Sequence, residues 1–222
     1  MIYKRGRTFD HDMIALPKLE MIEIGGKRHY NTPIGPLKSV STILGERMDH
    51  SSLVAWKMAV GEELAARIST QATTRGTAVH RIAEKYLLNE RAYTKGEMPA
   101  NIETFSRIRS TLDERVGLIH GIELQLWSSA LRTAGTTDLV AEFDGINSIV
   151  DFKTSKREKS EDMILGYFIQ TTTYSYMLEE RTGIRAPQIA IIIAVDDGKT
   201  QVFVKNRIYY RHQVLNLFCT DK

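Results

Sequence analysis

The spacing of apolar residues changes character along the chain, and the change falls near residue 120. Between about residues 41 and 120, apolar side chains recur every three or four positions, which is the period of an amphipathic helix. The first predicted helix carries its apolar residues, Trp56 among them, on one face, which we expect to be buried. The predicted helices cover about residues 51–69, 74–90 and 100–119.

Beyond residue 120, short runs rich in valine, isoleucine, threonine and phenylalanine predict β-strands. One long helical pattern interrupts them and ends at Gly183, a residue suited to a helix C-cap. Because strands and helices alternate in this order, we expect an α/β fold with a central mixed sheet flanked by helices. The strands are predicted at about 122–128, 136–144, 148–155, 188–195 and 201–205, and the helices at 161–182 and 207–218.

Neither an internal repeat nor a low-complexity linker divides the 222 residues, a length that suits one domain with a substantial core. We therefore expect a single domain over residues 1–222. Its predicted parts are an N-terminal segment of loops and a hairpin turning at Gly25–Gly26 (1–40), a helical elaboration (41–120) and an α/β core (121–222).

The composition favours a globular protein of the cytoplasm. Hydrophobic residues make up 42% and charged residues 26% of the chain, as in ordinary soluble domains. The formal net charge of +3 is compatible with a nucleic-acid partner without requiring one. Because no apolar run approaches about 18 residues and the start lacks a signal-type core, we expect neither a membrane partner nor export. The one cysteine, Cys219, excludes an internal disulfide and any four-cysteine zinc or iron–sulfur site.

Two acidic residues and a lysine stand out in the central strands. Asp138 and Asp151 lie in neighbouring predicted strands, joined by turn residues at 144–147. Side chains alternate along a strand, so Asp151 and Lys153 point the same way while Phe152 enters the core. An antiparallel hairpin can bring Asp138 beside Asp151. Two carboxylates and an amine on one edge of a sheet suit the binding of a divalent metal beside a scissile phosphate.

The same three residues also allow a plainer interpretation. An Asp-x-Lys sequence on a strand is usually a solvated face, and a lysine flanked by two acids also suits a structural salt-bridge network. The apolar residues before Asp151 favour a buried strand, and buried carboxylates are rare unless they are paired or bind a metal. This context favours the metal site.

Two predicted helices carry polar pairs four residues apart, which places each pair on one helical face. His80 and Glu84 form the first pair, in a helix that Arg75 opens, and histidine is a common metal ligand. Gln170 and Tyr174 form the second pair and suit contacts with a substrate backbone. Each pair has a structural alternative, because a lone helical histidine is usually a surface or core residue and a tyrosine often packs between a helix and a sheet.

Four further positions are candidates from their place in the chain alone. Arg75 precedes a helix whose exposed amides could meet a phosphate. Lys156 and Arg157 lie just beyond the Asp-x-Lys strand, where they could neutralise phosphates that lead into the site. Glu123, at the start of the first central strand, is a reserve acidic residue.

In their order and spacing, these motifs resemble the RecB-type branch of the PD-(D/E)XK nucleases. Residues 30–35 (YNTPIG) and 39–44 (SVSTIL), followed by Trp56, are similar more specifically to the mitochondrial genome maintenance exonucleases and their phage relatives. The resemblance covers roughly residues 28–180 and implies a restriction-endonuclease-like core. Some RecB-type members hold an iron–sulfur cluster with four cysteines, so it points to the cluster-free members. The motifs are Gly76-x3-His80-x3-Glu84, Gly135-x2-Asp138, Asp151-x-Lys153 and Gln170-x3-Tyr174.

The resemblance implies a role for each residue of the motifs. Asp138 and Asp151 would bind Mg²⁺ or Mn²⁺, with the backbone carbonyl of Phe152 and the side chain of His80 as further ligands. Lys153 would position and activate the attacking water and offset the charge that grows on the phosphate. Gln170 and Tyr174 would position the substrate, and Glu84 would support the site, holding His80 or coordinating through water.

The implied function is a metal-dependent DNA exonuclease that hydrolyses phosphodiester bonds at free ends of single-stranded DNA. Recombination, repair and degradation of DNA, in a bacterial cell or one infected by a phage, are the settings that we expect. Two alternatives stay open: a structure-specific endonuclease with the same site, and a non-catalytic nucleic-acid-binding module of the same fold. The presence of Asp138, Asp151 and Lys153 together favours catalysis.

Overall fold

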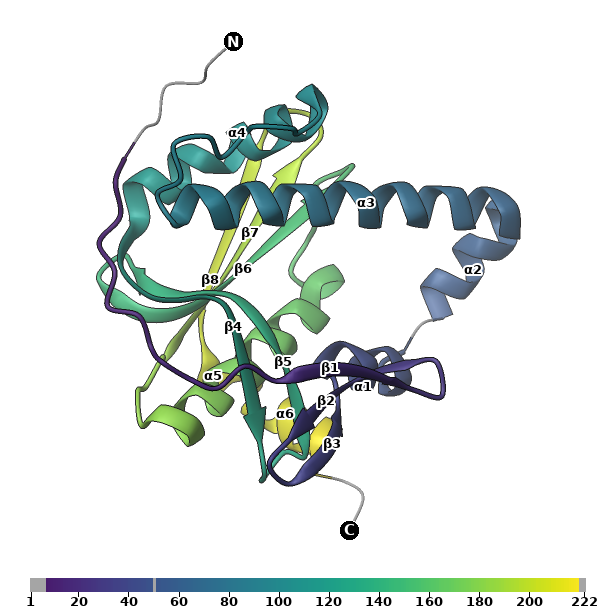
Figure 1. The fold of residues 1–222 in the computed structure, drawn as a ribbon. Helices are drawn as coiled ribbons and strands as arrows, with labels where there is room; N and C mark the ends of the chain where they lie inside the picture. The colour runs from purple at the N-terminus through teal and green to yellow at the C-terminus, as the bar shows by residue number, and fades with distance from the viewer. Residues whose placement is uncertain (1–6, 50, 220–222) are drawn as a thin grey trace.

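The computed structural model describes residues 7–49 and 51–219, which form two β-sheets with helices packed around the larger one (Figure 1). The smaller sheet is antiparallel and lies near the N-terminus. Its first turn is the predicted one at Gly25–Gly26, where both glycines have positive φ. A third strand that the sequence did not predict completes it. Its strands, in spatial order, are β1 (Glu20–Ile24), β2 (Lys27–Thr32) and β3 (Gly35–Lys38).

The larger sheet has five strands and is mixed. β6 and β7 run parallel, and the other neighbouring pairs are antiparallel. A parallel pair needs a crossover connection, which a helix between the two strands supplies here. The predicted α/β class with a central mixed sheet flanked by helices is confirmed. In spatial order the strands are β4 (Val116–Ser128), β5 (Thr133–Phe143), β6 (Ile146–Ser155), β7 (Gln188–Val195) and β8 (Thr200–Asn206).

Helices cover both faces of the larger sheet (Figure 1). On one face, α3 and α4 pack through a cluster that includes Val79, Ile108 and Phe152, so the predicted burial of Phe152 is confirmed. On the other face, α1, α5 and α6 pack through a cluster that includes Ile149 and Met177. The helices are α1 (Val40–Arg47), α2 (Ser51–Val60), α3 (Glu62–Leu87), α4 (Pro99–Arg115), α5 (Leu165–Thr182) and α6 (Arg211–Phe218), with short 3-10 helices at Asp162–Ile164 and Arg207–Tyr210.

Two predicted helix boundaries are wrong. The helices predicted at 51–69 and 74–90 divide instead at Gly61, whose φ of 85° lies outside the helical region, and α3 then continues unbroken to Leu87. The helix predicted at 100–119 ends at Arg115, because Val116 already pairs with Phe143 of β5. Pairing with a neighbouring strand outweighs local helix preference there.

The apolar face predicted for the first helix is also not buried. On the predicted face, Leu53 of α2 is 43% exposed, Leu64 of α3 is 48% exposed, and Trp56 is half-buried rather than part of the core. Figure 1 shows the reason: α2 and the first half of α3 extend beyond the larger sheet, so no second layer covers them. None of the helices in the described residues is both long and apolar enough to cross a membrane. The predicted single-domain organisation stays a prediction, and residues 1–6, 50 and 220–222 lie outside the described residues.

Candidate active site

Three acidic residues lie side by side on adjacent strands of the larger sheet. The pairs Ile122↔Leu139 and Leu124↔Thr137 place Glu123 of β4 directly across from Asp138 of β5. One position beyond Leu139↔Val150, the last pair between β5 and β6, Asp138 faces Asp151 of β6. The hairpin predicted to join Asp138 and Asp151 is therefore present.

The site begins where β5 and β6 stop pairing. This separation leaves the backbone amide and carbonyl of Phe152 without a strand partner on the β5 side. The amide donates to Oδ2 of Asp138 at 2.8 Å, and Nε2 of His80 lies 2.8 Å from the carbonyl oxygen. Side chains from α3 and β5 thus satisfy a buried peptide group, as a buried backbone requires. The carbonyl predicted to bind a metal has His80 as its partner here, and its role as a metal ligand stays a prediction.

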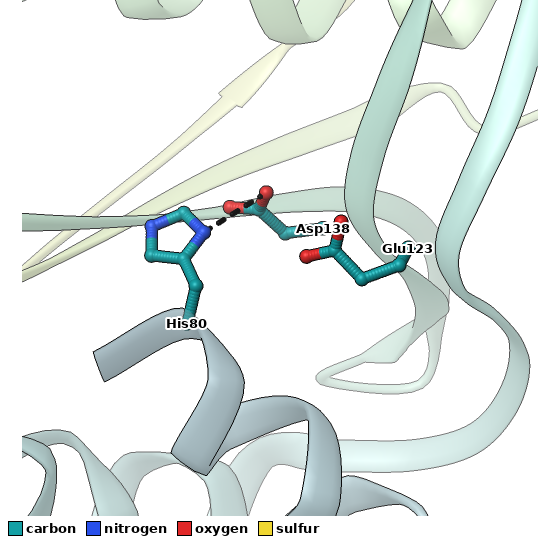
Figure 2. Close-up of side chains that lie close together, drawn as sticks. All are labelled: His80, Glu123 and Asp138. Carbon is teal, nitrogen blue, oxygen red and sulfur yellow. Dashed lines mark ion pairs between the residues drawn. The ribbon is translucent and has the colours of Figure 1, made fainter. Parts of the chain in front are cut away.

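The hydrogen bond to Phe152 determines which nitrogen of His80 can bind a metal. A carbonyl oxygen only accepts, so Nε2 must carry the proton. The other nitrogen, Nδ1, lies 3.3 Å from Oδ1 of Asp138. His80, Glu123 and Asp138 each offer one ligand atom, and the three atoms lie within 4.8 Å of one another (Figure 2). A backbone carbonyl that accepts from one ring nitrogen, and so turns the other toward the ion, is typical of metal sites.

Asp151 and Lys153 form the second half of the site. Asp151 is 2% exposed and forms an ion pair with Lys153, whose ammonium group also lies 5.0 Å from the centre of the Tyr167 ring. Burial raises the pKa of Asp151 to about 6, although Lys153 opposes this shift. Burial would lower the pKa of Lys153, but Asp151 and Asp138 outweigh it, so that pKa is raised and the ammonium stays charged.

Burial and the crowding of carboxylates also shift the pKa values of Glu123, His80 and Asp138. Desolvation, reinforced by the charge of Asp138, raises the pKa of Glu123 to about 7. Burial opposes a charge on His80, but the Asp138 carboxylate outweighs it and raises the His80 pKa to about 9. Burial likewise opposes the charge on Asp138, but His80 and then Lys153 hold its pKa below the ordinary value. Glu123 also has φ of 49°, a left-handed conformation that is strained for a glutamate.

These residues fit a hard divalent cation. Three carboxylates and an oriented imidazole nitrogen supply the oxygen and nitrogen donors that such ions accept. Oδ2 of Asp151 is buried and has no hydrogen-bond partner among residues 7–49 and 51–219, although the Lys153 ammonium lies beside it as an ion-pair partner. Burial, reinforced by the neighbouring carboxylates, raises the pKa values of Glu123 and Asp151 and so disfavours their charged forms in the absence of a cation.

A cleft of about 610 Å³ opens over the site. Predicted residues from three elements line it: His80 and Glu84 of α3, the acids and Lys153 of the sheet, and Gln170 and Tyr174 of α5. Tyr174 is buried, and Nε2 of Gln170 lies 3.4 Å from its hydroxyl. The structure therefore brings most of the predicted site residues to one cleft. Residues that we did not predict line it too: Met21, Arg28, Tyr30, Ser39, Ser41, Thr77, Arg81, Gln125 and Thr136.

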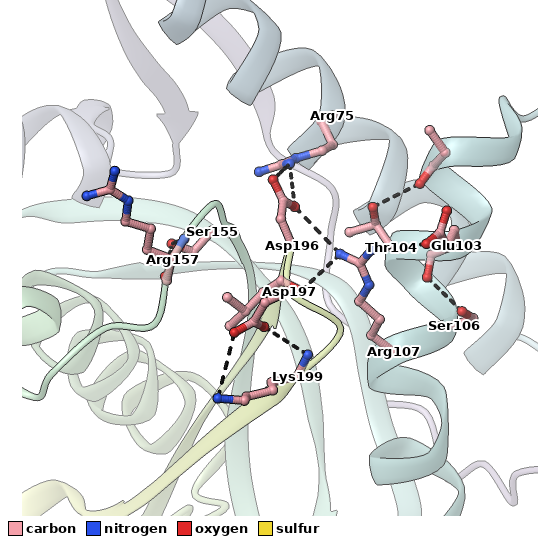
Figure 3. A network of polar contacts seen from close by, with 12 residues as sticks. Arg75, Glu103, Thr104, Ser106, Arg107, Ser155, Arg157, Asp196, Asp197 and Lys199 are labelled. Carbon is pink, nitrogen blue, oxygen red and sulfur yellow. Dashed lines mark hydrogen bonds and ion pairs between the residues drawn. The ribbon is translucent and has the colours of Figure 1, made fainter.

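Arg75, Lys156 and Arg157 are not among the residues that line the cleft. Nη1 of Arg75 lies 2.7 Å from both carboxylate oxygens of Asp196, in the turn between β7 and β8, and Arg107 of α4 reaches the same acid (Figure 3). Arg75 therefore ties α3 to the end of the sheet. Lys156 and Arg157 are exposed on the loop after β6. Their predicted contacts with phosphates stay predictions.

The unpredicted lining residues gave a weak signal in the sequence. Tyr30, Ser39 and Ser41 lie within the segments 30–35 and 39–44 that carry the family resemblance, but no chemistry marked them individually. Arg28 is a charged residue in a hairpin, which is usually a solvated position. Its place in the cleft depends on how the small sheet packs against β5, for example through the hydroxyls of Tyr30 and Thr136, 3.1 Å apart.

Comparison with known proteins supports a relationship to nucleases. No family model matches the sequence. The chain is 28% identical over 150 residues to mitochondrial genome maintenance exonuclease 1 of the mouse (Mus musculus), an alignment that covers 60% of this chain and 44% of the mouse protein. The chain thus spans less than half the length of that relative. A solved structure from Eubacterium rectale, described as "Putative exonuclease", has a TM-score of 0.46 at 16% identity, covering 67% of this chain and 64% of that one. The sequence similarity confirms the predicted resemblance to a nuclease family, whereas the branch within it stays a prediction.

Proposed function

We propose that this chain, a relative of exonucleases, is a metal-dependent deoxyribonuclease with a PD-(D/E)XK core that degrades single-stranded DNA from free ends. One observation carries the proposal: Glu123, Asp138 and Asp151 lie in a row on three strands, with His80 above them and Lys153 beside them, in one cleft. A salt-bridge network does not explain this arrangement well, because three carboxylates share one lysine and one histidine. Burial and the charge of Asp138 raise the pKa values of two of the three carboxyl groups, Glu123 and Asp151.

In this proposal, Nδ1 of His80 and the carboxylates of Glu123, Asp138 and Asp151 hold Mg²⁺ or Mn²⁺. The bound ion supplies Lewis acidity toward a phosphate oxygen and lowers the pKa of a bound water. His80 keeps its orientation through Phe152, and the amide of Phe152 keeps Asp138 in place. Because these contacts are preformed, the ligands need little reorganisation when the ion binds.

Lys153 is the catalytic cation of the proposal. Its ammonium stays charged beside Asp151, and it faces the cleft next to the metal ligands. There it orients the attacking water and offsets the charge that grows on the phosphate oxygens. Gln170 and Tyr174 border the same cleft and position the substrate strand, and Glu84 supports His80 from the next turn of α3.

The decisive experiment is digestion of end-labelled linear single-stranded DNA alongside a covalently closed single-stranded circle. Both are incubated with Mg²⁺, with Mn²⁺ and with EDTA, and a matching RNA strand tests the choice of nucleic acid. We expect metal-dependent loss of the linear DNA and survival of the circle. Cutting of the circle would show an endonuclease instead. Binding of the DNA without cutting in either metal would overturn the catalytic proposal and leave the binding module.

Variants link the activity to the site. We expect Asp151→Ala and Lys153→Ala each to lower the rate by about a hundredfold or more, since each removes a group aimed at the reacting phosphate or its metal. The matched control is Asp197→Asn, an acid of the β7–β8 turn whose partner is Lys199 and which does not line the cleft. Activity that survives in both site variants would contradict the assignment of the site.

A further inference from the structure

We propose that Arg28, on the small N-terminal sheet, binds a phosphate group of the nucleic-acid strand in the cleft. The inference rests on the proposed function and adds to it a second wall of the substrate site. The first wall is formed by α3 and the acidic strands, which hold the metal ligands. The second is formed by the small sheet and the start of α1, from which Met21, Arg28, Tyr30, Ser39 and Ser41 line the same cleft.

The register of the small sheet explains why Arg28 faces the cleft. Met21 pairs with Tyr30, and Glu23 pairs with Arg28, so these four residues lie on one face of the β1–β2 ribbon. Tyr30 extends from this face to Thr136 of β5, two residues before Asp138. Arg28 and Tyr30 are two positions apart on β2 and therefore point the same way. The face that carries Arg28 is thus fixed relative to the metal ligands.

The charges of the cleft single out Arg28. Besides His80, the cationic side chains that line it are Arg28, Arg81 and Lys153. Arg81 donates to both oxygens of Glu97, at 2.7 and 2.6 Å, and Lys153 pairs with Asp151. Across the described ranges 7–49 and 51–219, Arg28 has no carboxylate within 4.0 Å, although Glu23 lies across from it on β1. Its guanidinium is therefore available to an anion.

A cationic side chain is required for an anion to bind favourably in this acidic cleft. Four acids line the cleft, and they repel a polyanionic strand wherever a cation does not offset them. The proposed metal lies on the wall formed by α3 and the acidic strands, so it does not reach a phosphate held against the small sheet. A guanidinium suits the remaining task, because its fork of N–H donors matches phosphate oxygens and it keeps its charge at every physiological pH.

The backbone at Arg28 is held firmly, which adds to its ability to position a strand. Its carbonyl accepts from the amide of Ser39 at 3.0 Å and from the hydroxyl of Thr42 at 3.2 Å. These bonds join β2 to the N-terminus of α1, where Ser39 is the N-cap and the exposed Ser41 borders the cleft. Helix N-termini favour negative charge, so this wall attracts phosphates as a unit.

The test measures binding of a fluorescein-labelled single-stranded oligonucleotide by anisotropy, in EDTA to prevent cleavage and over a series of salt concentrations. We expect Arg28→Gln to weaken binding about tenfold at low salt and to reduce the slope of log K against log salt by about 0.7, the value for one lost phosphate contact. Arg28→Lys retains part of the affinity because the charge remains. The matched control is Lys27→Gln, which removes a cation from the next position of β2, one that pairs with Glu46 and does not line the cleft.

The outcomes separate this inference from the proposed function. Equal slopes and affinities for Arg28→Gln and Lys27→Gln would overturn the phosphate contact, whatever the cleavage assay shows. A reduced slope for Arg28→Gln alone supports the contact even if no metal promotes cutting, in which case the catalytic proposal fails and the binding wall stands. Circular dichroism of each variant shows whether the fold is intact, which we expect because Arg28 is exposed.

Discussion

At Gly135, the sheet and α5 lie too close together for any side chain. A Cβ atom at this position would lie 2.8 Å from both the hydroxyl oxygen and a ring carbon of Tyr174. The ring is buried and cannot move away without disturbing its neighbours. The glycine three residues before Asp138 is thus explained by packing beside the site.

We expect Gly135→Ala to lower the free energy of unfolding by about 1–3 kcal/mol, the usual cost of overpacking, and to reduce activity through displacement of Tyr174. Urea denaturation measures the first effect and DNA digestion the second. Gly76→Ala is the matched control for the stability measurement, because a Cβ there would have only the Thr154 hydroxyl near it, at 4.0 Å. An alanine within α3 should leave stability equal or higher. Equal effects of the two substitutions would contradict the packing argument.

The position of α3 depends on a polar clamp at the far end of the sheet. Arg75 of α3 and Arg107 of α4 both reach Asp196, and Arg107 also donates to the carbonyl of Val195 at 2.9 Å (Figure 3). The clamp lies five residues before His80 on the same helix. It therefore acts on the site through the placement of α3 against the sheet.

We expect Asp196→Asn to lower the free energy of unfolding by about 1–2 kcal/mol, because two arginines lose a charged partner. The thermal midpoint should fall by about 2–4 °C for each kcal/mol, which calorimetry detects. Weaker binding of Mn²⁺ should accompany this loss if α3 shifts His80. Asp197→Asn, at the next position of the same turn, should change neither quantity. A thermal midpoint of the Asp196 variant equal to that of the wild type would contradict a stabilising role for this clamp.

The sequence predicted the boundaries of the helices less accurately than their presence. The predicted end of the long helix at Gly183, with φ of 76°, agrees with α5, because the cap is a local feature, whereas α5 begins at Leu165 rather than at residue 161. The division at Gly61 and the early end of α4 do not agree with the prediction. Val116 begins β4 because β5 lies beside it, and a single-chain pattern contains no record of that neighbour.

At the scale of the whole molecule, the crowded acids make the stability of the metal-free protein depend on pH. The pKa values of His80, Glu123 and Asp151 are raised in the folded state to about 9, 7 and 6. The folded protein therefore binds more protons than the unfolded chain. The stabilisation that each of the three groups adds is complete below its pKa in the unfolded chain. This stabilisation is lost as the pH rises through the pKa of the group in the folded protein. Asp138, with a lowered pKa, contributes throughout this range.

We therefore expect stability in EDTA to fall steadily from pH 5 to pH 9, by an amount that urea denaturation at pH 5, 7 and 9 can measure. Glu123→Gln should remove the share of the decline that Glu123 contributes up to about pH 7, while the share of Asp151 up to about pH 6 remains. Added Mn²⁺ should restore stability most at high pH, because it binds the deprotonated ligands. Stability that rises between pH 5 and pH 9 in EDTA would show that other groups dominate.

By itself, the sequence determined the fold class and which acidic residues of the central strands come together. Alternating apolar residues define strands wherever they lie, and the hairpin turn between β5 and β6 sets a register that brings Asp138 to Asp151. The spacing of His80 and Glu84 likewise places both on one face of α3. These features are local or depend on one turn, so a pattern in the chain is enough to predict them.

Only the tertiary structure decided which residues share the cleft. It joined Glu123 to the acids through pairing of β4 with β5, placed Arg28 in the same cleft, and engaged Arg75 with Asp196 instead of the cleft. Arg28 lies more than a hundred residues from Asp138 along the chain, and its position follows from the packing of one sheet on another. Such contacts depend on the shapes and charges of whole elements, which no short pattern of residues encodes.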